Sequence, residues 1–145
     1  MNIFIDTNIL IDVIGKREDF FENAQKILKL GEEGTINLFI SPLSLVNSLY
    51  ILKRTYKIDE ERVKTILKQI TTFIKVTDMT GKNVDDALNS NFKDFEDALQ
   101  NFSAENNTII SVIITRNPQD FSSSSLLVQT PKEFLDTNNF NEKNS

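Results

Sequence analysis

Short apolar runs alternate with helix-forming segments along this chain, and this alternation limits the fold more than any other feature. The runs that predict β-strands are residues 3–5, 36–41, 72–77, 108–115 and 126–130. The segments that predict helices are residues 7–14, 19–30, 42–56, 59–70, 83–88, 94–105 and 131–135. Strands that alternate with helices pair in parallel through crossover connections. We therefore expect an α/β fold, a three-layer α/β/α sandwich with a mostly parallel sheet of four or five strands and the first strand at its centre.

A length of 145 residues fits one domain with a substantial core. We expect this domain to span residues 1–136 and the polar, asparagine-rich residues 137–145 to form a flexible tail. No segment reaches the roughly 20 apolar residues that a membrane span requires, and no basic leader precedes an apolar stretch. The sequence predicts a soluble, unprocessed, cytoplasmic protein that does not enter membranes.

The chain contains no cysteine and no histidine. Disulfides and thiolate metal sites are therefore excluded, as are histidine-dependent catalysis and the commonest zinc ligand. Carboxylates remain as the main chemically capable groups. A net charge of −5 argues against broad electrostatic binding of a polyanion, but it permits a nuclease whose metal ion supplies the positive charge locally.

The first apolar run stops at a carboxylate, Asp6. An unpaired buried charge costs several kcal/mol, so Asp6 must be compensated or lie at an open edge of the fold. In open parallel sheets, ligands bind beyond the carboxyl ends of the strands. Asp120 follows the strand predicted at 108–115 by a few residues, and the two acids approach each other if those strands are neighbours.

A third acid comes from the helix predicted at 94–105, where Asp94 and Asp97 lie three residues apart. These acids have a purely structural explanation, since Asp94 can cap the helix and Asp97 can interact with its dipole. The apolar positions of this helix predict its buried face, and they are Phe95, Ala98, Leu99 and Phe102. In the helix at 19–30, Gly31 and Gly34 are expected to mark the end.

Three carboxylates at one edge repel one another, each pair by about 4 kcal/mol at 4 Å and an effective dielectric constant near 20. A divalent cation removes that cost. Carboxylate oxygens and waters suit Mg²⁺ or Mn²⁺, and such an ion lowers the pKa of bound water and stabilises charge on a phosphoryl group. The acids and the missing histidines therefore favour one interpretation, a hydrolase that depends on Mg²⁺ or Mn²⁺.

Three motifs in this chain carry a resemblance to a known family. They are FIDTNIL at residues 4–10, DFEDAL at 94–99 and IITRNPQDF at 113–121. In this order and combination they resemble the PIN-domain ribonucleases, especially the small single-domain toxins of the VapC type. The resemblance implies that Asp6, Asp97 and Asp120 are catalytic metal ligands. It also implies that Thr115 and Asn117 form hydrogen bonds that position the last acid or a water.

The same resemblance implies a metal-dependent endoribonuclease that hydrolyses phosphodiester bonds of RNA and is the toxin of a toxin–antitoxin pair. Its expected partners are the RNA substrate, a cognate antitoxin and a second copy of the chain in a homodimer. Thr7 and Asn8 would shape the turn around Asp6, or simply begin the following helix.

One position departs from the family pattern. The family usually carries a glutamate on the helix after the second strand, and here the matching residue is Asn47. Its helical face also carries Leu43 and Tyr50, so we expect its amide to point toward apolar surroundings and to need a partner. Asn47 can position a metal-bound water but cannot act as a base, or it can merely satisfy a backbone group.

Other interpretations remain open. A PIN fold without activity would bind RNA or a protein partner, and Asn47 motivates that alternative. A haloacid-dehalogenase-like phosphatase also begins with a strand that ends in aspartate, but it requires a second aspartate where this chain has Asn8. The segment LKRTYK at 52–57 gathers basic residues near Tyr50 and Tyr56. It predicts either phosphate and base contacts or a solvated helix end.

Overall fold

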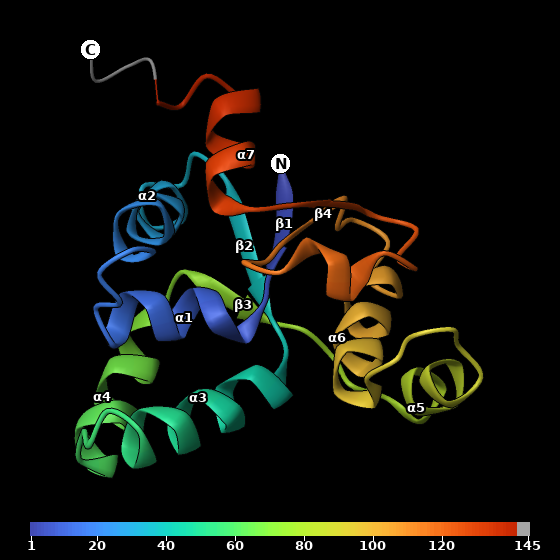
Figure 1. Ribbon diagram of the computed structural model, residues 1–145, viewed down its shortest axis with the longest axis horizontal. Coiled ribbons are helices and arrows are strands. Elements are labelled where there is room, and N and C mark those ends of the chain that lie inside the picture. Colours follow the sequence, from blue (N-terminus) through green and yellow to red (C-terminus); the bar gives the residue numbers. More distant parts are fainter. Residues whose placement is uncertain (142–145) are drawn as a thin grey trace.

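A five-stranded parallel sheet forms the centre of the computed structural model, which describes residues 1–141 (Figure 1). The strands are β1 (Asn2–Ile5), β2 (Asn37–Ile40), β3 (Ile74–Val76), β4 (Val112–Ile114) and β5 (Leu127–Gln129). They follow the order β3-β2-β1-β4-β5, and all neighbouring pairs are parallel. β1 is central, because Phe4 is in register with both Phe39 of β2 and Ile113 of β4. The predicted α/β fold and the central first strand are confirmed.

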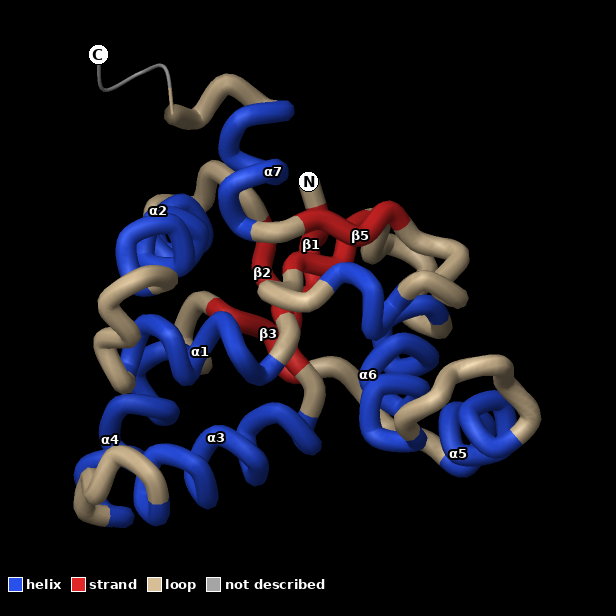
Figure 2. Tube along the Cα trace, viewed as in Figure 1, coloured by secondary structure: helices blue, strands red, loops and turns tan. Residues whose placement is uncertain are grey.

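Helices cover both faces of the sheet. They are α1 (Thr7–Ile14), α2 (Phe21–Glu32), α3 (Pro42–Arg54), α4 (Glu60–Ile70), α5 (Gly81–Leu88), α6 (Phe95–Glu105) and α7 (Pro131–Thr137), with a short 3-10 turn, η1, at Pro118–Phe121. Figure 2 shows α1, α2 and α7 on one side of the strands and α5 and α6 on the other. None of the helices within residues 1–141 combines the length and apolar content needed to cross a bilayer.

The alternation of side chains along β1 builds two separate cores. Ile3 and Ile5 point to one face, where they join a buried cluster with residues of α1, α2 and α7. Phe4 points to the opposite face and packs with Ala104 of α6 and Phe121 of η1. Because both faces are buried, β1 is apolar at every position from 3 to 5, as expected for a central strand of a parallel sheet.

Two predicted element boundaries are wrong for identifiable reasons. The strand expected at 108–115 shrinks to β4, because the Ile110 N–H donates to the Asn107 carbonyl at 3.0 Å and closes a turn. α2 continues through Gly31 to Glu32 instead of ending there. A Cβ at Gly31 would overlap Leu38 of β2, so this glycine allows close packing of helix on sheet and does not stop the helix.

The buried face predicted for α6 is right only in part. Ala98 is buried and Leu99 and Phe102 are half-buried, but Phe95 is 47% exposed. Gln100 and Asn101 are also buried, because α6 packs against a layer of polar side chains on one flank. The apolar spacing at 95–102 therefore coincides only partly with the direction of burial.

The C-terminal region continues beyond the predicted end of the last helix. α7 extends to Thr137, and Phe140 lies against Phe134 with ring centroids 5.9 Å apart. The remaining part of the predicted tail, residues 142–145, lies outside the described residues.

Candidate active site

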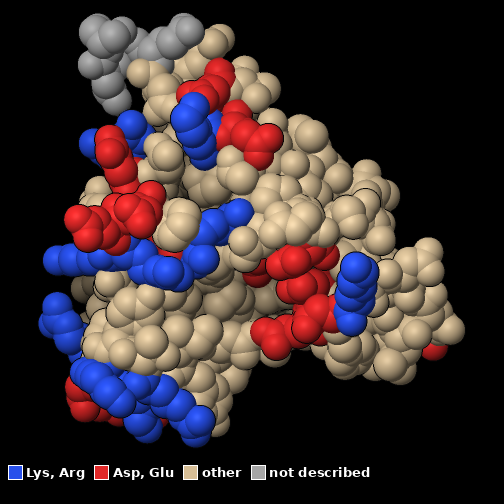
Figure 3. All heavy atoms as spheres, viewed as in Figure 1, with Lys and Arg blue, Asp and Glu red and all other residues tan. Residues whose placement is uncertain are grey.

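Two neighbouring strands end at the same place and present polar residues there. Asp6 follows β1 and Thr115 follows β4, and the Asp6 N–H donates to the carbonyl of Ile114 at 3.0 Å. A cavity of about 530 Å³ opens beside them. The polar residues that line its inner end are Asp6, Asn47, Glu96, Asp97, Asn117 and Asp120. Figure 3 shows acidic side chains gathered on this face, next to an area of basic side chains.

Three hydrogen bonds hold the Asp6 carboxylate. Its Oδ1 accepts from the backbone N–H of Thr7 at 2.7 Å, as the cap of α1. Its Oδ2 accepts from the Thr115 hydroxyl at 2.9 Å and from the Asn8 amide at 3.3 Å. These donors offset the cost of placing a partly buried charge at the end of a strand. Asp6 is therefore both a helix cap and a rigidly oriented carboxylate.

Asn8 and Thr115 connect the loops that follow β1 and β4. The Asn8 Oδ1 accepts from the Arg116 N–H at 3.2 Å, and the buried Thr115 hydroxyl accepts from the Asn117 N–H at 3.1 Å. The Asn117 carbonyl accepts from the Asp120 N–H at 3.0 Å. Thr115 thus contacts the first acid of the predicted site through its side chain, and Asn117 contacts the last acid through its backbone.

Asp97 projects into the cavity from the first turn of α6. Asp94 caps this helix, and its Oδ1 accepts from the Asp97 N–H at 2.9 Å, so the structural role expected of Asp94 is confirmed. The pKa of Asp97 is raised to about 7, mainly by burial and then by the nearby charges of Asp6, Asp94, Asp120 and Glu96. Asp94 can therefore cap α6 while Asp97 takes part in the site.

The Asp6 pKa is raised for related reasons. Burial is the largest cause, and the hydrogen bonds from Thr115 and Thr7 oppose it. The charges of Asp120 and Glu96 add to the increase. The carboxylates at this end of the cavity therefore repel one another, although they come from three different parts of the chain.

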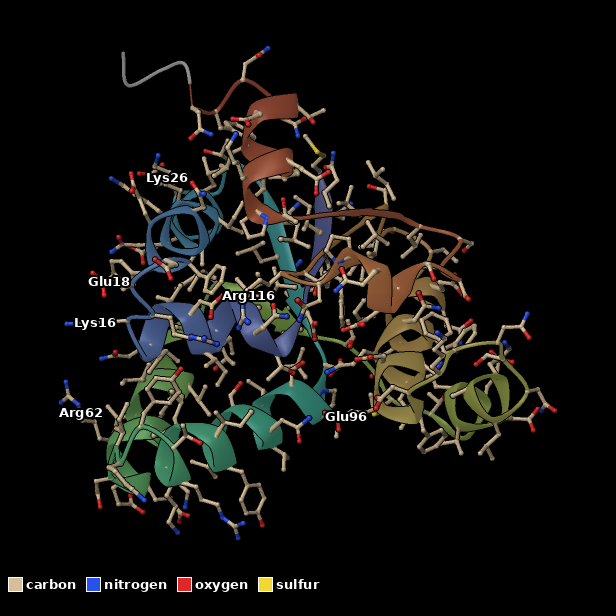
Figure 4. The ribbon with its side chains drawn as sticks, in the orientation of Figure 1. Lys16, Glu18, Lys26, Arg62, Glu96 and Arg116 are labelled. Atoms are coloured by element: carbon tan, nitrogen blue, oxygen red, sulfur yellow. The ribbon has the colours of Figure 1, made fainter. Side chains whose placement is uncertain are left out.

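Glu96 is a site residue that the sequence did not indicate. The Asn47 amide of α3 donates to the Glu96 carboxylate, and Figure 4 shows Glu96 between α3 and α6. Asn47 has the partner that we expected, but the partner is charged, so the predicted apolar surroundings are wrong. Because Glu96 directly precedes Asp97, no spacing distinguishes it from an ordinary solvated residue. Its position depends on how α3 and α6 meet.

A buried network of polar side chains connects the helices that carry the site residues. The Gln100 amide donates to Ser44 at 2.7 Å and to Thr7 at 3.3 Å, and the Thr7 hydroxyl donates to Ser44 at 2.9 Å. Ser41 donates to the Gln100 carbonyl oxygen. This network links α1, α3 and α6, which carry Thr7, Asn47 and Asp97, and it fixes their spacing more specifically than apolar contacts do.

The basic segment at 52–57 contributes less than the sequence allowed. Lys53 pairs with Glu60 at 3.2 Å, and the Arg54 guanidinium lies 5.3 Å from the Tyr50 ring centroid. From residues 50–57, the cavity is lined by Tyr50, Ile51, Thr55 and Tyr56, and by none of the lysines or the arginine. The lysines match the solvated helix end, and the aromatic residues remain candidates for contact with a ligand.

The donor chemistry of the inner end fits a hydrated divalent cation. Carboxylate oxygens are the ligands that Mg²⁺ and Mn²⁺ prefer, and Mg²⁺ usually keeps several waters and contacts only one or two carboxylates directly. Among residues 1–141, the structure contains no group of three or more acidic side chains assembled closely enough to hold a metal ion directly. The arrangement thus fits an ion held by one or two acids and, through waters, by the others.

The raised pKa of Asp97 predicts a pH dependence of stability. Its pKa is about 7 in the folded protein and near 3.8 in the unfolded chain, so the folded state holds the extra proton between these values. In EDTA, the free energy of unfolding should fall as the pH rises from about 4 to about 7, and level off above. Urea unfolding of the wild type and Asp97→Asn at pH 5 and pH 8 measures this. We expect the difference in free energy of unfolding between the wild type and Asp97→Asn to change by about 1 kcal/mol between pH 5 and pH 8, after allowance for solvent screening. If the two proteins lose the same stability between these pH values, the prediction is wrong.

Comparisons with known proteins agree with this fold. A family model described as PIN domain matches residues 2–128. No curated protein sequence matches the chain. A toxin–antitoxin complex from Klebsiella pneumoniae superimposes with a TM-score of 0.64 at 24% identity, covering 88% of this chain and 96% of that chain. VapBC2 from Rickettsia felis, bound to a DNA fragment from its promoter, superimposes with a TM-score of 0.61 at 19% identity. This match covers 90% of this chain and 98% of that chain.

A third similar structure is VapC20 from Mycobacterium tuberculosis, described as a toxin that cleaves the sarcin–ricin loop. Its TM-score is 0.58 at 17% identity, covering 77% of this chain and 86% of that chain. At these identities the structures are evidence of a shared fold. Together with the family match over most of the sequence, they show that the chain belongs to the PIN-domain family.

Proposed function

We propose that this protein is an endoribonuclease that hydrolyses phosphodiester bonds of RNA and depends on Mg²⁺ or Mn²⁺. The observation that carries the proposal is the arrangement of Asp6, Glu96, Asp97 and Asp120 around one cavity of a PIN fold. Burial raises the pKa of Asp6 and of Asp97, and the charges of neighbouring acids raise both further, which supports a site that is completed by a cation.

The residues of the site have distinct tasks in this proposal. Asp6 and Asp97 hold the cation, and Asp120 and Glu96 act through its waters. When bound, the ion stabilises charge on the phosphoryl group and lowers the pKa of a bound water. Thr115 and Asn8 keep the Asp6 carboxylate in one orientation. Asp97 gives up its proton near neutral pH, which exposes both of its oxygens for binding.

The test is cleavage of a fluorescently labelled single-stranded RNA by the purified protein. We expect cleavage in Mn²⁺ or Mg²⁺, none in EDTA, and recovery when the metal is restored. Because the active protein must bind the ion, Mn²⁺ should also raise the melting temperature of the wild type. A protein that neither cuts RNA nor responds to Mn²⁺ in its melt would contradict the proposal.

A second function is favoured by a specific observation, namely that no three acids within residues 1–141 are assembled to hold an ion directly. In that case the PIN fold is a binding module for RNA or a protein, with Asn47 in place of the glutamate. RNA binding without cleavage in any divalent metal would support this alternative.

The biological role that we propose is that of a toxin held by a cognate antitoxin. One of the similar structures is described as a toxin–antitoxin complex and another as VapBC2 bound to promoter DNA. On α3, Val46 is 51% exposed and Tyr50 is 54% exposed. Exposed apolar residues near the site suit a protein partner or a second copy of the chain. Co-purification with a small protein from the neighbouring reading frame, and light scattering over a wide concentration range, distinguish these partners.

A further inference from the structure

The cavity continues well beyond its acidic end. Its outer part lies between α1 and α3, which pack against each other and both begin near Asp6. From Asn47 to Thr55, two lining residues, the cavity follows α3 for about 12 Å. Arg17, Tyr50 and Tyr56 also line this part. It therefore has a different chemistry from the acidic end, with two arginines, Arg17 and Arg116, and two aromatic rings.

Arg17 carries a positive charge that no acid neutralises within residues 1–141. Its guanidinium lies 5.4 Å from the ring centroid of Phe20. Arg116 lies 4.6 Å from the same ring, but it forms a two-pronged ion pair with the buried Asp12, with N–O distances of 2.9 and 3.0 Å. The charge of Arg116 is thus balanced, whereas the charge of Arg17 is available to a ligand.

The charge distribution in the cavity selects the kind of ligand that fits there. The carboxylates at the inner end repel phosphate groups, so a nucleic-acid strand needs attraction elsewhere along its path. A guanidinium matches the geometry of a phosphate and binds it through two hydrogen bonds. Contact with the Phe20 ring limits the conformations of Arg17, which lowers the entropy cost of binding.

The two tyrosines supply surfaces for bases. Tyr50 is 54% exposed, and the Tyr56 ring lies so close to Gly15 that a Cβ there would come within 2.7 Å of Tyr56 Cε1. Tyr56 therefore has a fixed position that depends on the glycine. A cationic groove with aromatic side chains is the usual combination for binding single strands, because exposed bases stack on the rings.

We propose that the outer part of this cavity binds single-stranded RNA next to the bond that is cut, with Arg17 on a phosphate and Tyr50 and Tyr56 against bases. This inference rests on the proposed function, since it assigns the substrate path of the same site. The ligand must be an unpaired strand, because the bases of a duplex are stacked within the helix and cannot reach the tyrosines.

The experiment measures the binding of a labelled single-stranded RNA by fluorescence anisotropy at several NaCl concentrations, in an Asp6→Asn background that does not cut. Arg17→Gln should raise the Kd about tenfold, the low end for a hydrogen bond to a charged group. It should also reduce the slope of log Kd against log salt by about 0.7, the value for one phosphate contact on a single strand. Tyr50→Ala should raise the Kd about fivefold without changing the slope.

Arg62→Gln is the matched control, because Arg62 is an exposed residue of α4 and lies far from Arg116 in Figure 4. We expect its Kd and slope to equal those of the Asp6→Asn parent. If Arg17→Gln also equals the parent, or if duplex RNA binds as tightly as the single strand, the inference is wrong while the proposed function stands. If the wild type neither binds nor cuts RNA, the proposed function itself fails.

Discussion

Asp6→Asn is expected to lower RNA cleavage at least about a hundredfold and, in the same protein, to raise the melting temperature without metal. Cleavage falls because the amide replaces a charged ligand that its neighbours hold in one orientation. The melting temperature rises because the charge of Asp6 is partly buried and is repelled by Asp120 and Glu96. We expect an increase of about 3 °C, the effect of roughly 1 kcal/mol in a protein of this size.

Asp6→Asn keeps only part of the hydrogen bonding of Asp6. An asparagine Oδ1 still accepts from the Thr7 N–H, but the new amide meets two groups that cannot accept from it, the Asn8 amide and a Thr115 hydroxyl whose lone pairs are used by Asn8 and Asn117. The lost hydrogen bonds offset part of the gain, so the expected increase is small. Asp59→Asn is the control, because Asp59 is exposed at the start of α4 and its side chain caps nothing. A variant of Asp6 that cleaves RNA at the wild-type rate, or that melts earlier than the wild type in EDTA, would refute the assignment.

The second large effect concerns the pair formed by Asn47 and Glu96. Glu96→Gln should weaken Mn²⁺ binding about tenfold, because the site loses one of its carboxylates while the contact with α3 is kept. Asn47→Glu alone should tighten Mn²⁺ binding and raise cleavage, but lower the melting temperature in EDTA, since two carboxylates then face each other. The double variant moves the charge from α6 to α3 and should bring the Mn²⁺ affinity back to within about threefold of the wild type.

Titration of Mn²⁺ by calorimetry, with melts in EDTA and in Mn²⁺, measures all four proteins. Glu61→Gln on the exposed surface of α4 is the control for loss of a glutamate. Should Glu96→Gln bind Mn²⁺ like the wild type, Glu96 takes no part in the site and its contact with Asn47 is only structural. Should the double variant stay as weak as Glu96→Gln, the two positions are not equivalent with respect to the ion.

The sequence was informative wherever burial follows the local pattern. Ile3, Phe4 and Ile5 are apolar on both faces because β1 is covered on both sides, and the acid that follows them marks the open edge. Asp6 and Asp120 could be placed together because parallel strands end at a common edge, whereas Asp97 joined them only through the resemblance to the PIN-domain family. The roles assigned to them remain predictions for the experiments above.

The sequence was less informative wherever contacts between helices decide the outcome. Glu96 has no pattern that separates it from surface residues, and its importance comes from its hydrogen bond with Asn47 of α3. Gln100 of α6 is buried because its partners Ser44 and Thr7 lie on other helices, so the apolar spacing along α6 could not reveal it. Arg17 is one of 16 basic residues. The structure shows that the nearby acid Asp12 pairs with Arg116, so Asp12 does not neutralise the charge of Arg17.

The hydrogen bond from Thr115 to Asp6 joins positions 109 residues apart, and this separation affects when the protein becomes active. During synthesis, Asp6 leaves the ribosome first, but β1 cannot pair with β4 until residues 112–114 have followed. Until then the carboxylate lacks the hydroxyl that orients it, and Asp120 is still inside the ribosome. In the proposed ribonuclease, the site would therefore be incomplete while the chain is still being translated.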